Sequence, residues 1–298
     1  MSKYYGNVVL VTGASSGIGK SIAEYLAHMG YRVYGTSRKV SDNGSKLQVE
    51  VNSSGLVKTS GTTAGQEDLN INSGFVKMIQ MDVCNEESIK AAVEYILETE
   101  GELGIVINNA GIGIAGSIED TSPQEAFLQF DTNFFGVHRV IRQVLPSMRK
   151  QGKGLIINIS SVGAVFPIPF QGMYVASKAA IEAMSGTLRN ELRPFGIKVS
   201  LVEPGDTKTG FTKNRVFVKA GENSVYADQS RKSIAIMEHD EENGPDPVVV
   251  ARVVEKLINK KNPPVCVAVG LQYKLLVFFK RLVPKRFESY VVSKMYGI

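Results

Sequence analysis

Tyr174 and Lys178 are the residues whose types and spacing first point to chemistry. They are four positions apart, so a helix would place both side chains on one face. A tyrosine phenol titrates near pH ~10, and a cation within a few ångströms stabilises the phenolate and lowers that pKa. The pair is therefore a candidate acid/base, with Lys178 as the source of charge. The same spacing also fits an amphipathic pair on a helix surface, so the choice depends on the other motifs of the chain.

A glycine-rich turn near the N-terminus has the context of a dinucleotide-binding motif. The β-branched run from Val8 to Thr12 leads into this turn, and an apolar helical pattern begins at Ile22. Glycines let the backbone turn sharply and approach a pyrophosphate, whose charge the free N–H groups of the following helix attract. The alternative is a tight strand-to-helix turn without a ligand. The candidate cofactor-binding residues in the turn are Gly13, Ser15, Ser16, Gly17, Ile18 and Gly19.

A second strand, Arg32 to Thr36, is followed by Ser37 and Arg38. Enzymes that bind NAD place an acidic residue at this point for the ribose 2′-hydroxyl, whereas an arginine accommodates the 2′-phosphate of NADP. No acidic residue follows this strand, so the sequence predicts NADP(H) as the cofactor, bound by Ser37 and Arg38. The alternative is that Arg38 and Lys39 are a solvated strand end.

Two further strand ends carry candidate cofactor contacts. The strand Val76 to Asp82 leads into Val83, and the Asp82 carboxylate could accept the adenine amino group or cap the helix that begins near Asn85. The sequence leaves these two roles equally open. The buried run Gly104 to Ile107 leads into small and amide-bearing residues, which let a nucleotide lie against the backbone. These residues are Asn108, Asn109, Ala110 and Gly111.

Composition and charge exclude several classes of function. The 298 residues are 43% hydrophobic and 21% charged, which is ordinary for a globular protein with a full core. The chain has 34 basic and 29 acidic residues, and the basic residues form no long runs except near the C-terminus. Nucleic-acid binding is therefore not expected. Cys84 and Cys266 have no metal-ligand spacing and fit a reducing compartment. We expect no metal site, because the histidines are scattered at His28, His138 and His239.

The N-terminus and the hydropathy predict a cytoplasmic protein. The apolar run from Val8 breaks at Thr12, far short of a signal-peptide core. No stretch reaches the roughly 18 consecutive apolar residues of a membrane span. The strongest candidate, Leu271 to Val283, is interrupted by basic residues.

Three segments depart from the pattern of alternating strands and helices. Residues 40–74 are rich in Ser, Gly, Asn and Thr and are expected to form a surface insertion, either a loop or a small hairpin of Lys46 to Val51 and Gly55 to Thr59. Residues 206–244 mix aromatic and charged side chains and are expected to form a lid over the substrate. Residues 271–298 form a basic amphipathic extension. Packing or an oligomer contact is favoured for it, and a membrane surface or the substrate pocket is the alternative.

With these residues in place, the chain resembles the short-chain dehydrogenase/reductase family from Val8 to Val269, nearly its whole length. A single motif of this kind would be chance, but their occurrence together in the family's order is not. The motifs that carry the resemblance are the turn Thr12 to Gly19, Asp82-Val83, Asn108 to Gly111, Asn133, Ile159-Ser160-Ser161, Tyr174-x-x-x-Lys178 and Pro204-Gly205.

The resemblance implies a role for each catalytic residue. Ser161 would hydrogen-bond the substrate oxygen, and Tyr174 would exchange a proton with it as hydride moves to or from the nicotinamide. Lys178 would lower the pKa of Tyr174 and bind the nicotinamide ribose. Asn133 would hold a water of a proton relay. Tyr174 would also contact the cofactor. The further residues expected on its nicotinamide side are Pro204, Gly205 and Thr207, with Thr209 as the alternative to Thr207.

The patterns and the resemblance together imply one α/β domain. We expect residues 1–270 to form a single doubly wound Rossmann-type domain, with a parallel sheet of about seven strands and helices on both faces. The expected activity is NADP(H)-dependent interconversion of a secondary alcohol and a ketone. The apolar run Val162 to Phe170 either suits a lipophilic substrate, with a hydroxysteroid favoured, or is core packing. The alternatives are a retinoid, acyl or xenobiotic carbonyl, or a non-catalytic dinucleotide-binding regulator. We expect a homodimer or homotetramer.

Overall fold

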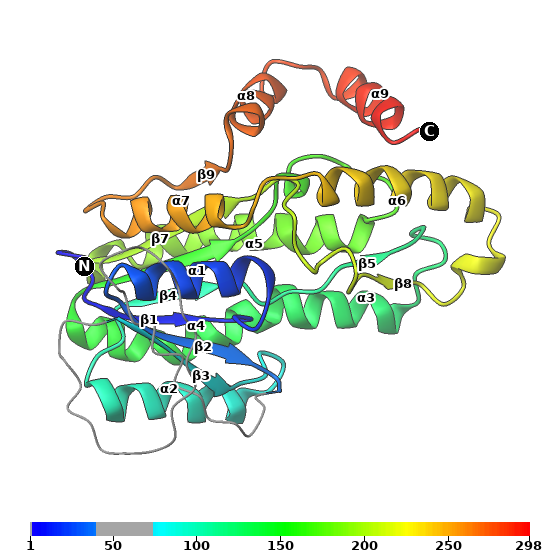
Figure 1. The fold of residues 1–298 in the computed structure, drawn as a ribbon. Helices are drawn as coiled ribbons and strands as arrows, with labels where there is room; N and C mark the ends of the chain where they lie inside the picture. Colours follow the sequence, from blue (N-terminus) through cyan, green and yellow to red (C-terminus); the bar gives the residue numbers. More distant parts are fainter. Residues whose placement is uncertain (1, 40–73) are drawn as a thin grey trace, which may run out of the picture.

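The β-branched runs of the sequence pair into one parallel sheet. The structure is a computed structural model and describes residues 2–39 and 74–298. The strands of this seven-stranded sheet lie in the order β3-β2-β1-β4-β6-β7-β9, and neighbouring strands are parallel (Figure 1). They are β1 (Val8–Val11), β2 (Arg32–Ser37), β3 (Phe75–Gln80), β4 (Ile105–Asn108), β6 (Gly154–Ile159), β7 (Ile197–Glu203) and β9 (Cys266–Ala268). The strand order reverses between β1 and β4, and open parallel sheets bind ligands at such a switch point.

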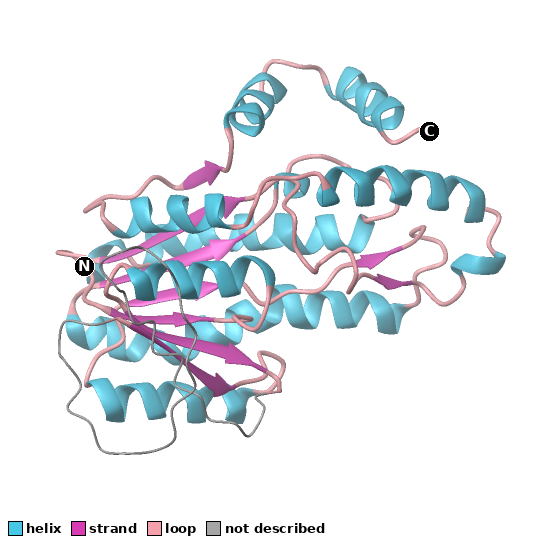
Figure 2. Cartoon of the chain, viewed as in Figure 1, coloured by secondary structure: helices cyan, strands magenta, loops and turns pink. Residues whose placement is uncertain are grey.

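Helices cover both faces of the sheet, which confirms the predicted doubly wound fold (Figure 2). One face carries α1 (Gly17–His28) and α7 (Val248–Ile258), and the other carries α2 (Glu86–Glu100), α4 (Gly136–Gln151) and α5 (Gly172–Glu191). Every residue of β6 is buried, which is typical of a parallel strand with helices on both sides.

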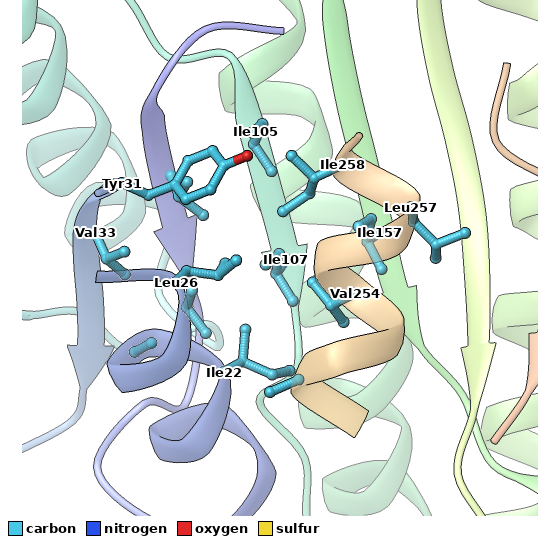
Figure 3. Packing of buried hydrophobic residues seen from close by; sticks show 14 of the residues in the cluster. Ile22, Leu26, Tyr31, Val33, Ile105, Ile107, Ile157, Val254, Leu257 and Ile258 are labelled. Carbon is cyan, nitrogen blue, oxygen red and sulfur yellow. The ribbon is translucent and has the colours of Figure 1, made fainter. Parts of the chain in front are cut away.

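Figure 3 shows the core between the sheet and the first pair of helices. Ile22 and Leu26 of α1 lie beside Val254 of α7, over Ile107 and Ile157 of the sheet. All five side chains are fully buried, and burying each of them contributes roughly 1.5–3 kcal/mol. This packing fixes α1 with its N-terminus at the carboxyl end of β1.

The helical region from Pro123 to Gln151 is interrupted by a turn of another helix type. α3 (Pro123–Phe130) begins at a capping box formed by Ser122 and Glu125, and a π-helical turn, η1 (Asp131–Phe135), separates it from α4. A π turn is an insertion within a helix and often lies at a functional site. Hydrophobic spacing does not reveal such an insertion.

Several short elements were not predicted by the sequence patterns. They are β5 (Ile114–Ala115), β8 (Val216–Phe217), which pairs with β5, and the short helical turns η2 (Val162–Ala164), η3 (Arg193–Phe195) and η4 (Gly221–Asn223). β8, η4 and α6 (Ala227–Glu242) lie in the segment 206–244, for which a lid is predicted. The hairpin predicted at Lys46 to Val51 and Gly55 to Thr59 lies outside the described residues.

The C-terminal extension forms two helices directly after β9. α8 (Leu271–Lys280) and α9 (Lys285–Met295) make an outer arch beyond α6 and α7, drawn orange to red in Figure 1. In residues 2–39 and 74–298, no helix has both the length and the apolar character that crossing a bilayer requires.

Candidate active site

A cavity of about 940 Å³ lies at the carboxyl edge of the sheet, where the strand order reverses. All residues that the sequence predicts for the site line this cavity, except Gly19, Asn133 and Asn108, whose buried amide donates to Asn158. The predicted residues in the wall are Gly13, Ser15, Ser16, Gly17, Ile18, Ser37, Arg38, Asp82, Val83, Asn109, Ala110, Gly111, Ser161, Tyr174, Lys178, Pro204, Gly205 and Thr207. The fold therefore brings together residues from seven segments of the sequence, and the volume falls within the range of cofactor sites.

The glycine turn after β1 fits the pyrophosphate of a dinucleotide. Gly13 and Gly17 have φ angles of 67° and 54°, a left-handed conformation that glycine adopts without strain. A Cβ atom at Gly13 would lie 2.9 Å from the Cα atom of Ala110. Ser16 is the N-cap of α1, but its side chain makes no capping hydrogen bond, so the hydroxyl leaves the first-turn N–H groups open to an anion.

Gly19 differs from its prediction, because it faces the turn itself and not the cavity. A Cβ atom there would lie 2.3 Å from both the Asn109 Nδ2 atom and the Gly13 carbonyl oxygen. The Asn109 amide donates hydrogen bonds to the carbonyl oxygens of Thr12 (3.0 Å) and Gly13 (3.2 Å). The Thr12 hydroxyl accepts the N–H groups of Asn109 and Ala110, both at 2.9 Å. The absence of a side chain at Gly19 thus leaves room for the hydrogen bonds that join the ends of β1 and β4. Thr12 belongs to the predicted motif, but its supporting role was not predicted.

Asn133 also lies behind the cavity wall, where it is fully buried. Its Oδ1 atom accepts the Ile112 N–H at 2.9 Å, and its Nδ2 atom donates to the Ile112 carbonyl at 3.0 Å. The same Nδ2 atom donates to the Ser177 hydroxyl at 3.2 Å. One amide therefore ties the segment after β4 to α5, the helix that carries Tyr174. The relay water predicted for Asn133 stays a prediction.

The two serines after β6 have different surroundings. Ser160 is buried, and its hydroxyl donates to the Glu182 carboxylate at 2.8 Å. The Ser161 oxygen accepts the Gly163 N–H at 3.0 Å. A hydrogen bond between Ser161 and Tyr174 also favours the phenolate and lowers the pKa of Tyr174. The geometry therefore supports Ser161, and not Ser160, as the serine beside the acid/base.

Tyr174 and Lys178 share one face of α5, as their spacing predicts. Lys178 is buried, and its ammonium group donates to the Ile159 carbonyl at 2.9 Å. This bond holds the Lys178 nitrogen 5.9 Å from the centre of the Tyr174 ring. Burial lowers the pKa of Lys178 to about 8, although the nearby Glu182 carboxylate favours the charged form.

The pKa of Tyr174 shifts in the direction opposite to the prediction. Burial raises it, and the hydrogen bond with Ser161 and the charge of Arg215 oppose the rise only in part. Lys178 does not contribute, because a lysine with a pKa of about 8 has lost its charge before a raised tyrosine titrates. An anion bound in the cavity would favour the charged form of Lys178 and so restore the predicted effect.

Sequence reasoning missed an aromatic and charged cluster beside Tyr174. The Phe211 ring centre lies 5.7 Å from that of Tyr174, and the Arg215 guanidinium carbon lies 5.9 Å from the Phe211 ring centre. The Arg215 side chain is 1% exposed and forms ion pairs with Glu238 and Glu241 of α6. These contacts fix the segment before β8 against α6. No sequence pattern joins residues so far apart, so only the presence of Phe211 in the predicted lid hinted at the cluster.

Asp82 and Arg38 lie at the cavity edge predicted to hold the adenosine. The Asp82 carboxylate accepts the Cys84 N–H at 2.9 Å, whereas Asn85 is the N-cap of α2. The alternative that Asp82 caps this helix is therefore wrong, and adenine recognition stays a prediction. The exposed Arg38 follows β2 and lines the same cavity.

The C-terminal extension supplies an apolar part of the cavity wall. The Tyr273 hydroxyl donates to the Asp206 carboxylate at 2.6 Å and accepts the Asp206 N–H at 3.0 Å, which joins α8 to the loop after β7. The apolar side chains of the extension that line the cavity include Leu276, Phe279, Val283, Phe287, Val291 and Met295. The extension thus contributes to the pocket, one of the alternatives that the sequence left open.

Comparisons with known proteins agree with this geometry. A family model described as short chain dehydrogenase matches residues 7–217. A 3-ketodihydrosphingosine reductase from Bacteroides thetaiotaomicron is 41% identical over 293 residues, which cover 98% of each chain. Retinol dehydrogenase 8 from Homo sapiens is 32% identical over 285 residues, which cover 91% of this chain and 84% of the relative.

A short-chain dehydrogenase/reductase from Burkholderia phymatum, solved in complex with NAD, has the same fold. Its TM-score is 0.74 at 24% identity, and the match covers 95% of this chain and 94% of that chain. The family model covers more than two thirds of the 298 residues, and it includes the glycine turn, Ser161, Tyr174 and Lys178. The chain therefore belongs to the short-chain dehydrogenase family.

Proposed function

We propose that this oxidoreductase uses NADP(H) to interconvert a hydrophobic secondary alcohol and its ketone. The observation that carries the proposal is the shared cavity. Its wall holds the glycine turn, the group of Ser161, Tyr174 and Lys178, and the apolar side chains of α8 and α9. A protein that only binds a dinucleotide for regulation would not need the second and third of these features.

The side chains support a hydride transfer coupled to a proton transfer. In the reducing direction, a bound nicotinamide would supply a hydride to the carbonyl carbon. Ser161 would hydrogen-bond the carbonyl oxygen, and Tyr174 would donate its phenolic proton to that oxygen, which completes the alcohol. A charged Lys178, held by the Ile159 carbonyl, would stabilise the phenolate that remains. In the oxidising direction the phenolate of Tyr174 would accept the proton.

The two adjacent serines allow a matched test of this assignment. We expect Ser161→Ala to lower kcat for ketone reduction by about 10²–10³-fold, the usual effect of removing a hydrogen bond to a developing oxyanion. Ser160→Ala should have a much smaller effect, because the Ser160 hydroxyl is committed to Glu182. Steady-state kinetics of both variants would check this, and equal losses would contradict the assignment of Ser161.

NADP(H) is proposed over NAD(H) because of the residues after β2. Ser37 and Arg38 both line the cavity, and the exposed Arg38 guanidinium is free to reach a 2′-phosphate. The structure of the Burkholderia phymatum protein was solved with NAD, so the family fold does not decide this point.

Arg38→Asp is expected to reverse the cofactor preference. A carboxylate repels the 2′-phosphate and can accept the 2′-hydroxyl of NAD, so kcat/KM for NADPH should fall by about 10²-fold or more while that for NADH rises. Kinetics with both cofactors would measure the change, with Lys39→Asp as the neighbouring control. A wild-type preference for NADH would contradict the proposal.

For the substrate, we propose a long-chain ketone of the kind named by 3-ketodihydrosphingosine reductase. Because the match to that protein covers 98% of this chain, it reaches into the extension that lines the cavity. The hydroxysteroid favoured by the sequence is the second candidate, and a retinoid is the third, in line with the retinol dehydrogenase similarity. All three carry a large apolar part and a carbonyl group that a hydride can reduce.

A spectrophotometric assay tests this function. Oxidation of NADPH would be followed with 3-ketodihydrosphingosine, a ketosteroid and retinal as separate substrates. We expect turnover with the long-chain ketone to have the highest kcat/KM. The absence of turnover with all three carbonyl compounds and both cofactors would favour the non-catalytic alternative.

The cellular setting is part of the same proposal. Cys84 and Cys266 are both free thiols, which supports the predicted cytoplasmic location. A homodimer or homotetramer is also proposed, and sedimentation equilibrium of the purified chain would determine the oligomeric state.

A further inference from the structure

The C-terminal extension holds the whole positive charge excess of the chain. Residues 271–298 contain six basic side chains and one acidic side chain, so that 28 basic and 28 acidic residues remain in residues 1–270. The six basic residues are Lys274, Lys280, Arg281, Lys285, Arg286 and Lys294. Lys280 and Lys285 lie 3.5 Å from the single acidic residue, the buried Glu288. The other four are exposed, so the arch presents a strongly positive surface to solvent.

An apolar stripe lies on the outer face of α8. Leu271, Leu275, Phe278 and Leu282 follow the spacing i, i+4, i+7 and i+11, which puts them on one side of a helix. They are 49% to 74% exposed, and none of the four lines the cavity. Lys274 and Arg281 flank this stripe along the same helix and its end.

The opposite face of the same helix belongs to the cavity. Leu276, Phe279 and Val283 line it from α8 and the residue stretch after it, and α9 adds Phe287 and Val291. The arch thus has two sets of apolar side chains: one set lines the pocket and is partly exposed, and the outer stripe lies outside the pocket and faces solvent. Burying the outer set in its own domain would require α8 to turn away from the cavity and break the Tyr273–Asp206 hydrogen bonds.

We propose that the arch of α8 and α9 docks this enzyme onto the surface of an anionic lipid bilayer. The outer stripe would enter the headgroup and acyl boundary, while the exposed cations would face lipid phosphates. An apolar substrate dissolved in the bilayer would then meet the cavity wall on the inner side of the same helices. That route depends on the proposed function, but the docking itself does not.

Charge complementarity favours a bilayer over a second copy of the chain. A two-fold symmetric dimer through this face would set the same positive patch against itself, and like charges in direct contact are unfavourable. An anionic surface satisfies both the cations and the exposed apolar stripe. The helices are too short to cross a bilayer, so the contact is peripheral.

Vesicle co-sedimentation of the full chain tests the proposal. We expect wild-type protein to sediment with vesicles containing phosphatidylglycerol and much less with vesicles of phosphatidylcholine alone, and added salt should weaken the binding. Lys274→Gln, Arg281→Gln and Arg286→Gln together should lower partitioning about 100-fold, at roughly fivefold for each cation. Leu275→Ser with Phe278→Ser should lower it about tenfold or more.

Matched surface variants show whether the effect belongs to the arch. Lys256→Gln, Lys260→Gln and Lys261→Gln remove three exposed cations elsewhere, and Phe195→Ser with Val225→Ser removes two exposed apolar side chains. These controls should bind vesicles as the wild type does. Failure of the wild type to bind anionic vesicles would overturn the proposal, as would equal losses in the controls. If the stripe variants instead convert a dimer to a monomer and leave vesicle binding unchanged, the face is a contact between copies.

Activity separates docking from catalysis. With a short water-soluble ketone, the arch variants should keep wild-type kcat/KM, because none of the changed side chains lines the cavity. With a long-chain ketone held in anionic vesicles, their turnover should fall together with their binding. Normal binding without turnover on any ketone would refute the proposed function alone.

Discussion

Tyr174→Phe is expected to lower kcat/KM for ketone reduction by about 10²–10⁴-fold, the usual contribution of a positioned general acid. The change removes one oxygen and keeps the ring that lies 5.7 Å from the Phe211 ring. Fold and cofactor binding should therefore persist, and the loss can be assigned to the phenolic proton. Single-turnover kinetics would measure the chemical step, and a fluorescence titration would measure the affinity for NADPH.

Tyr226→Phe is the matched control for this variant. Tyr226 donates its hydroxyl to Glu119 at 2.8 Å, outside the residues that line the cavity. Its loss should change kcat/KM by no more than about twofold, as for most surface substitutions. If Tyr174→Phe retains wild-type turnover, Tyr174 is not the acid/base and the proposed mechanism fails.

The fold was largely predictable because its strands and helices follow local rules. The buried runs at β1, β4 and β6 are short, rich in β-branched residues and bounded by glycine or polar residues, and each is a strand in the structure. The π turn at Asp131–Phe135 has no such signal. One inserted residue shifts the spacing of apolar residues by no more than this spacing normally varies along a helix. The two-residue strands β5 and β8 depend on each other across about a hundred residues of chain, so neither is visible alone.

The candidate site was predictable where its residues follow strand ends. The carboxyl ends of parallel strands meet at one edge of the sheet, so topology alone brings Gly13, Asn109 and Ser161 to the same cavity. The positions of Gly19 and Asn133 behind the wall required the three-dimensional packing. Both support the site through hydrogen-bonded neighbours, which a motif does not distinguish from direct contact.

Electrostatics was the least predictable part of the site. The i, i+4 spacing correctly placed Lys178 beside Tyr174, but it carried no information on burial, which moves the pKa values of the two residues in opposite directions. Arg215 and Glu241 approach Tyr174 only through tertiary packing, and both act on its pKa. When two charged residues are paired from their spacing alone, the direction of the pKa shift cannot be predicted until the burial of both side chains is known.

Because burial disfavours the phenolate of Tyr174, the charge of Lys178 should matter for catalysis, and Lys178→Met is the second variant with a large expected effect. The Lys178 nitrogen lies 5.9 Å from the centre of the Tyr174 ring. For a charge separation of about 6 Å and an effective dielectric constant of about 20, a full charge on Lys178 stabilises the phenolate by about 3 kcal/mol. Its removal should lower kcat by about 10²-fold, since each 1.4 kcal/mol corresponds to about tenfold in rate. Stopped-flow measurement of hydride transfer at saturating NADPH would detect the loss, and a kcat within about twofold of the wild type would contradict it.

The pH dependence distinguishes a lost charge from a lost contact. In the free enzyme Lys178 is charged below its pKa of about 8 and neutral above it, so kcat/KM for the cofactor should fall as the pH rises through about 8. Lys178→Met should lack this decline. Glu182→Gln keeps an oxygen that can accept the Ser160 hydrogen bond but removes the carboxylate charge that favours protonated Lys178, so the decline should move to lower pH. If the decline of kcat/KM occurs at the same pH in Glu182→Gln and is still present in Lys178→Met, another group is titrating. The role assigned to the charge of Lys178 would then be wrong.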